Sequence, residues 1–348
     1  MIRGEAWTSR VAAVSEPGLH GMRRARTHAE KAGSRSPFMF TSPHQPTEYV
    51  MTSARTAQEP ASRTAGSFFA RPAKAALADA LRNASYEILP FKSAEEKVLV
   101  HGPKDVALMV TTTEAKGLGP TIDLAVRLSE HGYSAAPHIA ARLVRDEAHL
   151  TDVVSRLRDS GVDRVFVIAG DASEPAGAFP DALSLLEGLQ AVGQAFASIG
   201  IGGYPEGHGR ISDEQIEKAL QAKAPYASHV ITQLCFDAET TIRWARTVQA
   251  AGVELPVRVG IPGAISRQKL IRVSAGLGLG QSARFLKKQQ NMLWRFFLPG
   301  GYSPNKLIER LTPAFGMSDH RLQGFHVFTF NDLDSTEAWR QAWLARLS

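Results

Sequence analysis

Polar side chains capable of acid–base or hydrogen-bonding chemistry stand near the ends of short apolar runs in this sequence. The first is Glu87, a lone carboxylate in the run Ala-Ser-Tyr-Glu-Ile-Leu-Pro at 84–90. Burial disfavours the charged form of a carboxyl group, so an acid in such a run can keep its proton near neutral pH. We therefore take Glu87 as a candidate proton donor. The other polar residues at run ends are Thr111, His138, Asp171, Tyr204, Glu206, His208 and Gln233.

Two of the acids also have a structural interpretation. Glu87 could pair with an arginine such as Arg142, although its place inside a hydrophobic run favours catalysis. Asp171 could cap the next helix. The helical pattern begins only near 183, well beyond Gly-Asp at 170–171, and this spacing favours a ligand contact for Asp171.

The remaining candidates also have structural interpretations. His138 follows a proline and could be a core histidine with satisfied hydrogen bonds. Tyr204 and His208 lie in a loop rich in glycine and proline, where ligand contact and turn formation give the same signal.

Short apolar runs alternate with amphipathic helical patterns from residue 85 onward, and the runs number eight. Most are continuously apolar, which is typical of parallel strands buried on both faces. We therefore predict the α/β class, with a single (β/α)8 TIM barrel over 71–348 that holds its chemistry at the carboxyl ends of the strands. The eight runs are 86–89, 106–112, 134–139, 164–169, 198–203, 229–236, 257–261 and 325–330.

A doubly wound sheet is the competing fold, because it uses the same alternation of strands and helices. That fold places a Gly-x-Gly-x-x-Gly turn after its first strand, and this sequence has none there. The nearest match, at 276–280, follows a helical pattern and is better explained as a helix stop.

The amino-terminal segment differs in composition from the rest. Residues 1–70 are rich in Ser, Thr, Ala, Pro and Arg without sustained apolar periodicity, and we expect a basic, largely disordered extension, followed by a helix from about Pro72 to Arg82. Residues 1–84 carry twelve basic and six acidic side chains, which accounts for the whole net charge of +6. Residues 85–348 are neutral overall and offer no bulk electrostatic basis for binding nucleic acid.

Composition narrows the setting further. No apolar run reaches the roughly 18 residues of a membrane span. The single cysteine, Cys235, excludes an intramolecular disulfide framework, and no Cys/His cluster has zinc spacing. We therefore expect a cytoplasmic protein without a metal site or a membrane partner, and we leave open whether it forms a homo-oligomer.

Six segments in order carry a family resemblance. They read Ser-Tyr-Glu-Ile-Leu-Pro at 85–90, Ala-Pro-His at 136–138, Gly-Asp at 170–171, Tyr-Pro-Glu-Gly-His at 204–208, Ile-Thr-Gln-Leu-Cys-Phe-Asp at 231–237 and Gly-Phe-His-Val-Phe-Thr-Phe-Asn at 324–331. Together they resemble the methylenetetrahydrofolate reductase family from residue 85 to about 340. The resemblance implies a TIM-barrel oxidoreductase of one-carbon and methionine metabolism that reduces 5,10-methylenetetrahydrofolate to 5-methyltetrahydrofolate. It also implies that Glu87 protonates the folate ring, while Asp171 and Gln233 hydrogen-bond the pterin.

The resemblance departs from the usual family pattern at the flavin. Members that hold FAD have a basic residue before the Gly-Asp pair and more basic residues after the fifth strand, whereas this chain keeps only Lys223. A shorter branch of the family resembles it here and passes hydride directly from NADH. The resemblance thus implies NADH or NADPH as cofactor, with FAD bound weakly or not at all. Cofactor contacts are implied at Thr111, His138, Tyr204, His208 and Lys223.

Other functions remain possible on sequence grounds. The same site could run physiologically in reverse, as a 5-methyltetrahydrofolate oxidase. A barrel aldolase is disfavoured, because the strands contain no lysine for a Schiff base. A non-enzymatic RNA-binding role would rest on the basic extension and on the basic, aromatic segment at 284–295.

Overall fold

The computed structural model describes residues 71–194, 196–208, 211–265 and 304–348. The chain divides into two units, Met1–Arg63 and Thr64–Ser348, and all of the described residues belong to the second. The predicted extension at 1–70, the glycine segment at 276–280 and the basic segment at 284–295 lie outside the described residues.

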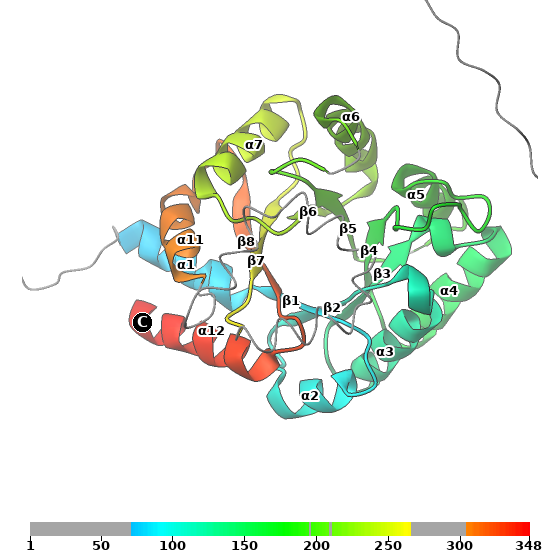
Figure 1. Ribbon diagram of the computed structural model, residues 1–348, viewed down its shortest axis with the longest axis horizontal. Helices are drawn as coiled ribbons and strands as arrows, with labels where there is room; N and C mark the ends of the chain where they lie inside the picture. The colour runs from blue at the N-terminus through cyan, green and yellow to red at the C-terminus, as the bar shows by residue number, and fades with distance from the viewer. Residues whose placement is uncertain (1–70, 195, 209–210, 266–303) are drawn as a thin grey trace, which may run out of the picture. The chain divides into compact units, whose positions relative to one another are not determined.

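Eight parallel strands follow one another in chain order and close into a barrel (Figure 1). β1 pairs with β2 on one side and with β8 on the other, so the first and last strands complete the ring. The (β/α)8 TIM barrel predicted from the sequence is therefore confirmed, and the doubly wound sheet is excluded. The strands are β1 Ser85–Ile88, β2 Ala107–Val110, β3 Ala135–Ala140, β4 Arg164–Ile168, β5 Ser198–Gly203, β6 His229–Thr232, β7 Val257–Pro262 and β8 Leu322–Phe328.

Helices surround the barrel, as Figure 1 shows. α1 and the carboxyl-terminal helix α12 pack against each other beside the closure of β1 and β8. The helix expected from about Pro72 to Arg82 is confirmed as α1. The described helices are α1 Arg71–Arg82, α2 Ala94–His101, α3 Gly119–Glu130, α4 Glu147–Asp159, α5 Ala182–Ala191, α6 Asp213–Lys223, α7 Ala238–Ala250, α11 Asn305–Leu311 and α12 Leu333–Leu347.

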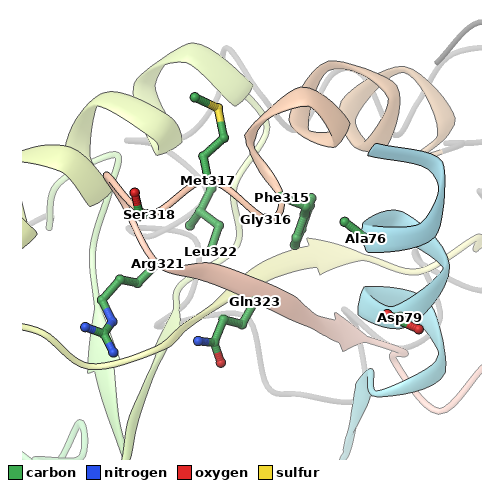
Figure 2. Close-up of a pocket in the computed structure, with 9 residues that line it drawn as sticks. All are labelled: Ala76, Asp79, Phe315, Gly316, Met317, Ser318, Arg321, Leu322 and Gln323. Atoms are coloured by element: carbon green, nitrogen blue, oxygen red, sulfur yellow. The ribbon is translucent and has the colours of Figure 1, made fainter. Parts of the chain in front are cut away.

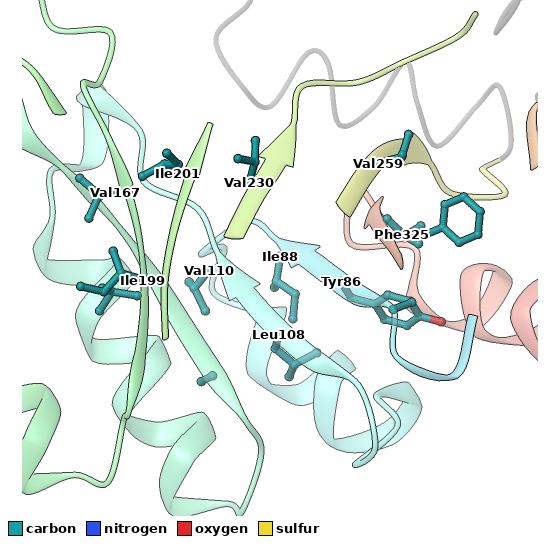
Figure 3. Close-up of a cluster of buried hydrophobic side chains, with 14 of the residues drawn as sticks. Tyr86, Ile88, Leu108, Val110, Val167, Ile199, Ile201, Val230, Val259 and Phe325 are labelled. Carbon is teal, nitrogen blue, oxygen red and sulfur yellow. The ribbon is translucent and has the colours of Figure 1, made fainter. Parts of the chain in front are cut away.

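Alternate side chains of each strand face opposite sides of the barrel wall. The outward-facing ones form the main hydrophobic cluster against the helices (Figure 3), and they include Tyr86, Ile88, Leu108 and Val110. The inward-facing ones form a second, smaller cluster inside the barrel. This interior cluster consists of Met109, Ala136, Phe166 and Ile231, with Ile168 packed against it.

A polar network ties β1 to α12, the helix that follows β8. The Tyr86 hydroxyl donates to Glu337 of α12 at 2.7 Å. The guanidinium of Arg340, buried at 1% exposure, donates to both oxygens of Glu337 at 2.9 Å, to the carbonyl of Leu81 and to Asp105. These bonds supply partners for a charge that would be costly to bury alone.

Most predicted strand bounds differ from the observed ones by one or two residues, and two strands differ by more at one end. The run 229–236 was expected to be one strand, but β6 ends at Thr232, because the Leu234 N–H turns back to the Gln233 side chain. The last strand begins at Leu322, three residues before the predicted 325. Exposed Gln323 and the glycine after it interrupt the apolar pattern there, and positive φ angles at Phe330 and Asn331 end the run.

Candidate active site

Glu87 lies on the inner face of the barrel wall. Its neighbours Tyr86 and Ile88 belong to the outer cluster, so the alternation of β1 directs Glu87 inward. Its side chain is 19% exposed, and the Thr329 hydroxyl donates to its backbone carbonyl at 2.6 Å. The structure thus places the predicted acid inside the barrel, on a strand held by its neighbour β8.

Two histidines lie near the Glu87 carboxyl group. His326 of β8 has its Nε2 at 3.8 Å from Oε2 of Glu87, and its Nδ1 lies 2.9 Å from the Ser85 hydroxyl. His138 of β3 is 6% exposed, and its ring contacts the Phe166 ring with the centroids 4.7 Å apart. Nε2 of His138 is buried without a hydrogen-bond partner. An unpartnered polar atom beside the acid is a natural contact for a bound molecule.

Burial controls the charge of all three groups. It raises the pKa of Glu87 to about 7, against a lowering effect of His138. It lowers the pKa of His138 to about 4, although Glu87 acts in the opposite direction. It lowers the pKa of His326 to about 3, and the positive charge of Arg258 adds to this. Both imidazoles are therefore neutral at pH 7, and the contact of His326 with Glu87 is not an ion pair.

The alternative interpretation, in which Glu87 pairs with Arg142, is wrong, because Arg142 binds the backbone of a loop instead. Its Nε donates to the carbonyl of Pro180 at 2.8 Å and its Nη1 to the carbonyl of Ala172 at 2.9 Å. The backbone of Ala176 adds a bond back to Arg142 at 2.8 Å. Arg142 therefore holds the loop between β4 and α5, which carries Asp171.

Asp171 follows a turn at the end of β4. Gly170 has a φ of +88°, and a Cβ there would lie 3.0 Å from the Cβ of Ala140, so glycine suits this position. The cap of α5 is Asp181, whose side chain accepts from the Ser184 N–H, and the capping interpretation of Asp171 is therefore wrong.

Tyr204 and His208 follow β5, and their rings meet edge to face with centroids 5.3 Å apart. Burial raises the pKa of Tyr204, and the negative charge of Asp171 raises it further. Asp171 and Tyr204 therefore lie within electrostatic range of each other. The structure brings these residues of the β4 and β5 loops together.

Gln233 follows β6, where its N–H donates to the carbonyl of Gly203 at 2.8 Å. Its side-chain oxygen accepts from the Leu234 N–H at 2.9 Å. Because the amide oxygen already accepts this bond, the NH2 group is the part of the side chain that can donate to a ligand. A Cβ at Gly260 of β7 would lie 2.3 Å from the carbonyl of Thr232, so glycine permits the close approach of β7 to this turn.

The two other predicted cofactor residues are Thr111 and Lys223. Thr111 lies buried just past β2, where its N–H donates to the carbonyl of Ile88 at 2.9 Å and its carbonyl accepts from the Thr121 hydroxyl at 2.8 Å. Lys223 is the last residue of α6 and is half-buried. Burial lowers its pKa, while the charge of Asp181 acts to raise it.

A pocket of about 590 Å³ lies elsewhere (Figure 2). Its lining includes Ala76 and Asp79 of α1 and Leu322 and Gln323, which begin β8. It is therefore at the amino-terminal end of the barrel, opposite to the strand ends that carry Glu87 and its neighbours. Within the described ranges, no helix is long and apolar enough to cross a membrane, and no three His, Cys, Asp or Glu side chains are grouped to hold a metal ion.

Sequence reasoning missed His326 and Ser85 as parts of this site. Both lie in segments that carry the family resemblance, but there they were interpreted as strand residues rather than as site residues. A signal was present in the sequence, because His326 stands between apolar Phe325 and Val327, so alternation along a strand directs it to the opposite face.

A closed parallel barrel that directs a carboxyl group of raised pKa into its interior belongs to the class of TIM-barrel enzymes. The particular family follows from comparison: the model of the methylenetetrahydrofolate reductase family matches residues 99–278. The chain belongs to that family, whose members are oxidoreductases. The matched range contains His138, Asp171, Tyr204, His208, Lys223 and Gln233, while Glu87 precedes it and His326 follows it.

Curated relatives agree over part of the chain. Methylenetetrahydrofolate reductase 2 of Saccharomyces cerevisiae is 28% identical over 124 residues, which are 32% of this chain and 20% of the yeast protein. Methylenetetrahydrofolate reductase 1 of Schizosaccharomyces pombe is 28% identical over 116 residues, or 31% of this chain and 19% of that protein. The matched segments thus span about a fifth of the length of these relatives.

A solved structure of 2,3-dimethylmalate lyase, a member of the PEP mutase/isocitrate lyase superfamily, is 14% identical with a TM-score of 0.38. The match covers 70% of this chain and 95% of that one. This likeness is too distant to bear on function.

Proposed function

We propose that this protein is a methylenetetrahydrofolate reductase that transfers hydride from NADH or NADPH to 5,10-methylenetetrahydrofolate. The observation that carries the proposal is the Glu87 carboxyl group, directed into the barrel with its pKa raised to about 7 by burial. A general acid works best when its pKa lies near the operating pH. About half of the Glu87 groups hold a proton at pH 7, against about 0.3% for a carboxyl group with a pKa of 4.5.

The proton has a defined purpose. The methylene carbon of the substrate bridges two nitrogens in a five-membered ring. A proton from Glu87 goes to one of these nitrogens, the bond between it and the methylene carbon breaks, and an iminium remains on the other. Hydride then adds to the iminium carbon and forms the methyl group. Loss of hydride oxidises the nicotinamide, and water returns a proton to Glu87.

Asp171 and Gln233 support pterin recognition. A pterin presents adjacent N–H donors and a carbonyl acceptor, which call for an acceptor and a donor from the protein. The Asp171 carboxylate supplies acceptors, and the NH2 group of Gln233 supplies donors, since Leu234 occupies the amide oxygen. The two residues follow β4 and β6, on either side of the loop that follows β5.

The residues assigned to a dinucleotide fit a resident flavin poorly. The diphosphate of FAD needs cationic partners, each charge-assisted hydrogen bond being worth about 1.5–3 kcal/mol. Lys223 is the single cation among the assigned residues, and its burial lowers its pKa. The guanidinium of Arg142, which holds the loop that carries Asp171, already donates to two backbone carbonyls. We therefore propose that FAD binds weakly or not at all.

A nicotinamide nucleotide carries the same diphosphate, but it needs much less affinity. It enters and leaves in each turnover as a co-substrate, for which binding in the range of 1 μM to 1 mM is ordinary. His138 supports this proposal, since its buried Nε2 needs a partner that a bound ring substituent can supply.

An anaerobic assay tests the proposal. NADH oxidation would be followed with methylenetetrahydrofolate, with and without added FAD, for the wild type, Glu87→Gln and the exposed control Glu96→Gln. We expect wild-type turnover without FAD, a fall of roughly 10²–10⁴-fold in Glu87→Gln and no change in the control. The wild-type rate should fall tenfold per pH unit above about 7, as Glu87 loses its proton.

Three results would contradict this proposal separately. Absence of folate-dependent NADH oxidation would refute the proposed function. Full activity in Glu87→Gln would refute the assignment of Glu87 as the proton donor. Stoichiometric flavin in the purified protein, visible in its absorbance spectrum, would refute the proposal that hydride passes directly from the nicotinamide to the folate.

A further inference from the structure

Glu206 connects two loops that carry proposed ligand contacts. It lies in the loop after β5, between Tyr204 and His208. Its Oε1 accepts hydrogen bonds from the N–H groups of Phe236 and Asp237, at 2.8 and 3.1 Å. Those residues belong to the loop after β6 that begins with Gln233. One carboxylate oxygen therefore joins neighbouring loops that the chain separates by about 30 residues.

Glu206 adds to the other attachments of the β6 loop, whose last residue, Asp237, also caps α7. Gln233 and Cys235 each donate a backbone bond to a neighbouring strand, at Gly203 and Gly260, both at 2.8 Å. The next two backbone N–H groups go to Glu206. Because the Gln233 amide depends on the path of this short turn, the orientation of its NH2 group depends on both ends of the turn being held.

Glu206 is equally fixed to its own loop. Gly207 has a φ of +74°, and its N–H donates to the carbonyl of Tyr204 at 3.1 Å, which closes a turn around Glu206. The rings of Tyr204 and His208 meet across that turn. The backbone of Glu206 therefore lies in the turn that carries both aromatic groups, while its carboxylate binds the β6 loop.

We propose that Glu206 is a positioning residue that couples pterin binding at Gln233 to nucleotide binding at Tyr204 and His208. This inference rests on the proposed function. Glu206 acts through these three side chains and takes no part in proton or hydride transfer. Its loss should raise the KM for both substrates and leave kcat at saturation nearly unchanged.

The test compares two substitutions with a control. Glu206→Leu removes the acceptor, while Glu206→Gln keeps an oxygen that can accept both N–H groups. Glu214→Leu, on the exposed face of α6, is the control. We expect Glu206→Leu to raise both KM values about 10-fold, Glu206→Gln to restore them to within about 3-fold of the wild type, and the control to leave them unchanged. If Glu206→Leu fails to fold, Glu206→Asp, shorter by one methylene group, should show the same shifts at smaller size.

A double-mutant cycle separates positioning from general stability. In a Gln233→Leu background, Glu206→Leu should change the folate KM by less than about 2-fold, because the group it positions is gone. The nucleotide KM should still rise about 10-fold there. A lowered melting temperature with unchanged KM values, or a folate effect that persists without Gln233, would overturn the inference.

The outcomes also separate this inference from the proposed function. If the wild type shows no folate-dependent turnover, both fail together. If the wild type turns over and Glu206→Leu keeps both KM values, only the inference fails.

Discussion

Burial of Glu87 should make the protein less stable at neutral and alkaline pH, and Glu87→Gln should relieve this. The native state holds the Glu87 proton more tightly than the unfolded chain, because the pKa rises from 4.5 to about 7. Stability that depends on this proton is fully present below pH 4.5 and is lost as pH rises through about 7. Glutamine keeps the shape of the neutral acid and cannot ionise.

The magnitude follows from the shift in pKa. Each pKa unit corresponds to about 1.4 kcal/mol, so a shift from 4.5 to about 7 corresponds to about 3 kcal/mol. This is an upper value, because relaxation around the carboxylate on ionisation lowers the cost. A gain of about 2–3 kcal/mol is large against the 5–15 kcal/mol of a typical folded protein.

The neighbouring histidines act in the opposite direction. The pKa values of His138 and His326 are lowered, to about 4 and about 3. The stability they contribute is therefore present above pH 6.5 and is lost as pH falls through those values. Both imidazoles are neutral at pH 6 and 8, where the difference between wild type and variant therefore reports on Glu87.

The measurement is urea unfolding of wild type, Glu87→Gln and Glu96→Gln at pH 4.5, 6 and 8 and constant ionic strength. We expect the free energy of unfolding of Glu87→Gln to equal that of the wild type at pH 4.5 and to exceed it by about 2–3 kcal/mol at pH 8. The exposed control should show no such trend. A difference between Glu87→Gln and wild type that stays constant with pH would refute the argument that Glu87 is buried as an acid.

Two further predictions concern the closure of the barrel. Asn331→Ala should lower the free energy of unfolding by about 2–4 kcal/mol in urea titrations. The Asn331 amide accepts from the Leu89 N–H at 2.8 Å and donates to its carbonyl at 2.9 Å, and alanine would leave both unpaired; a loss below about 0.5 kcal/mol would contradict this. Arg340→Ala should cost about 3–5 kcal/mol, because Glu337 would lose its buried partner. An Arg340→Ala protein that melts at the wild-type temperature would show that the network contributes nothing.

The fold could be predicted because it depends on local pattern. Eight apolar runs and the helices between them recur at short range, and the barrel follows from their number and order. The ends of the strands were harder to predict from the sequence, because they depend on single side-chain hydrogen bonds. The turn of Leu234 onto the Gln233 amide ends β6, yet three of the next four residues are apolar.

The site could be predicted only as a set of strand ends. What each residue contacts depends on how distant segments meet, as with Arg142, which binds the loop before α5 rather than Glu87. His326 was missed for the same reason. It approaches Glu87 because β8 closes the ring against β1, a contact across 239 residues that no local pattern records.

The pairing of one acid with two neutral histidines also bears on the reaction. In the proposed reaction, loss of the Glu87 proton to the substrate would create a carboxylate and an iminium together, and the two charges would stabilise each other. Hydride addition neutralises the iminium, and the negative charge left on Glu87 then draws a proton back. A protonated imidazole at His138 or His326 would hold the pKa of Glu87 down and leave it ionised before the substrate arrived. The burial that keeps these histidines neutral is therefore part of what keeps Glu87 an acid.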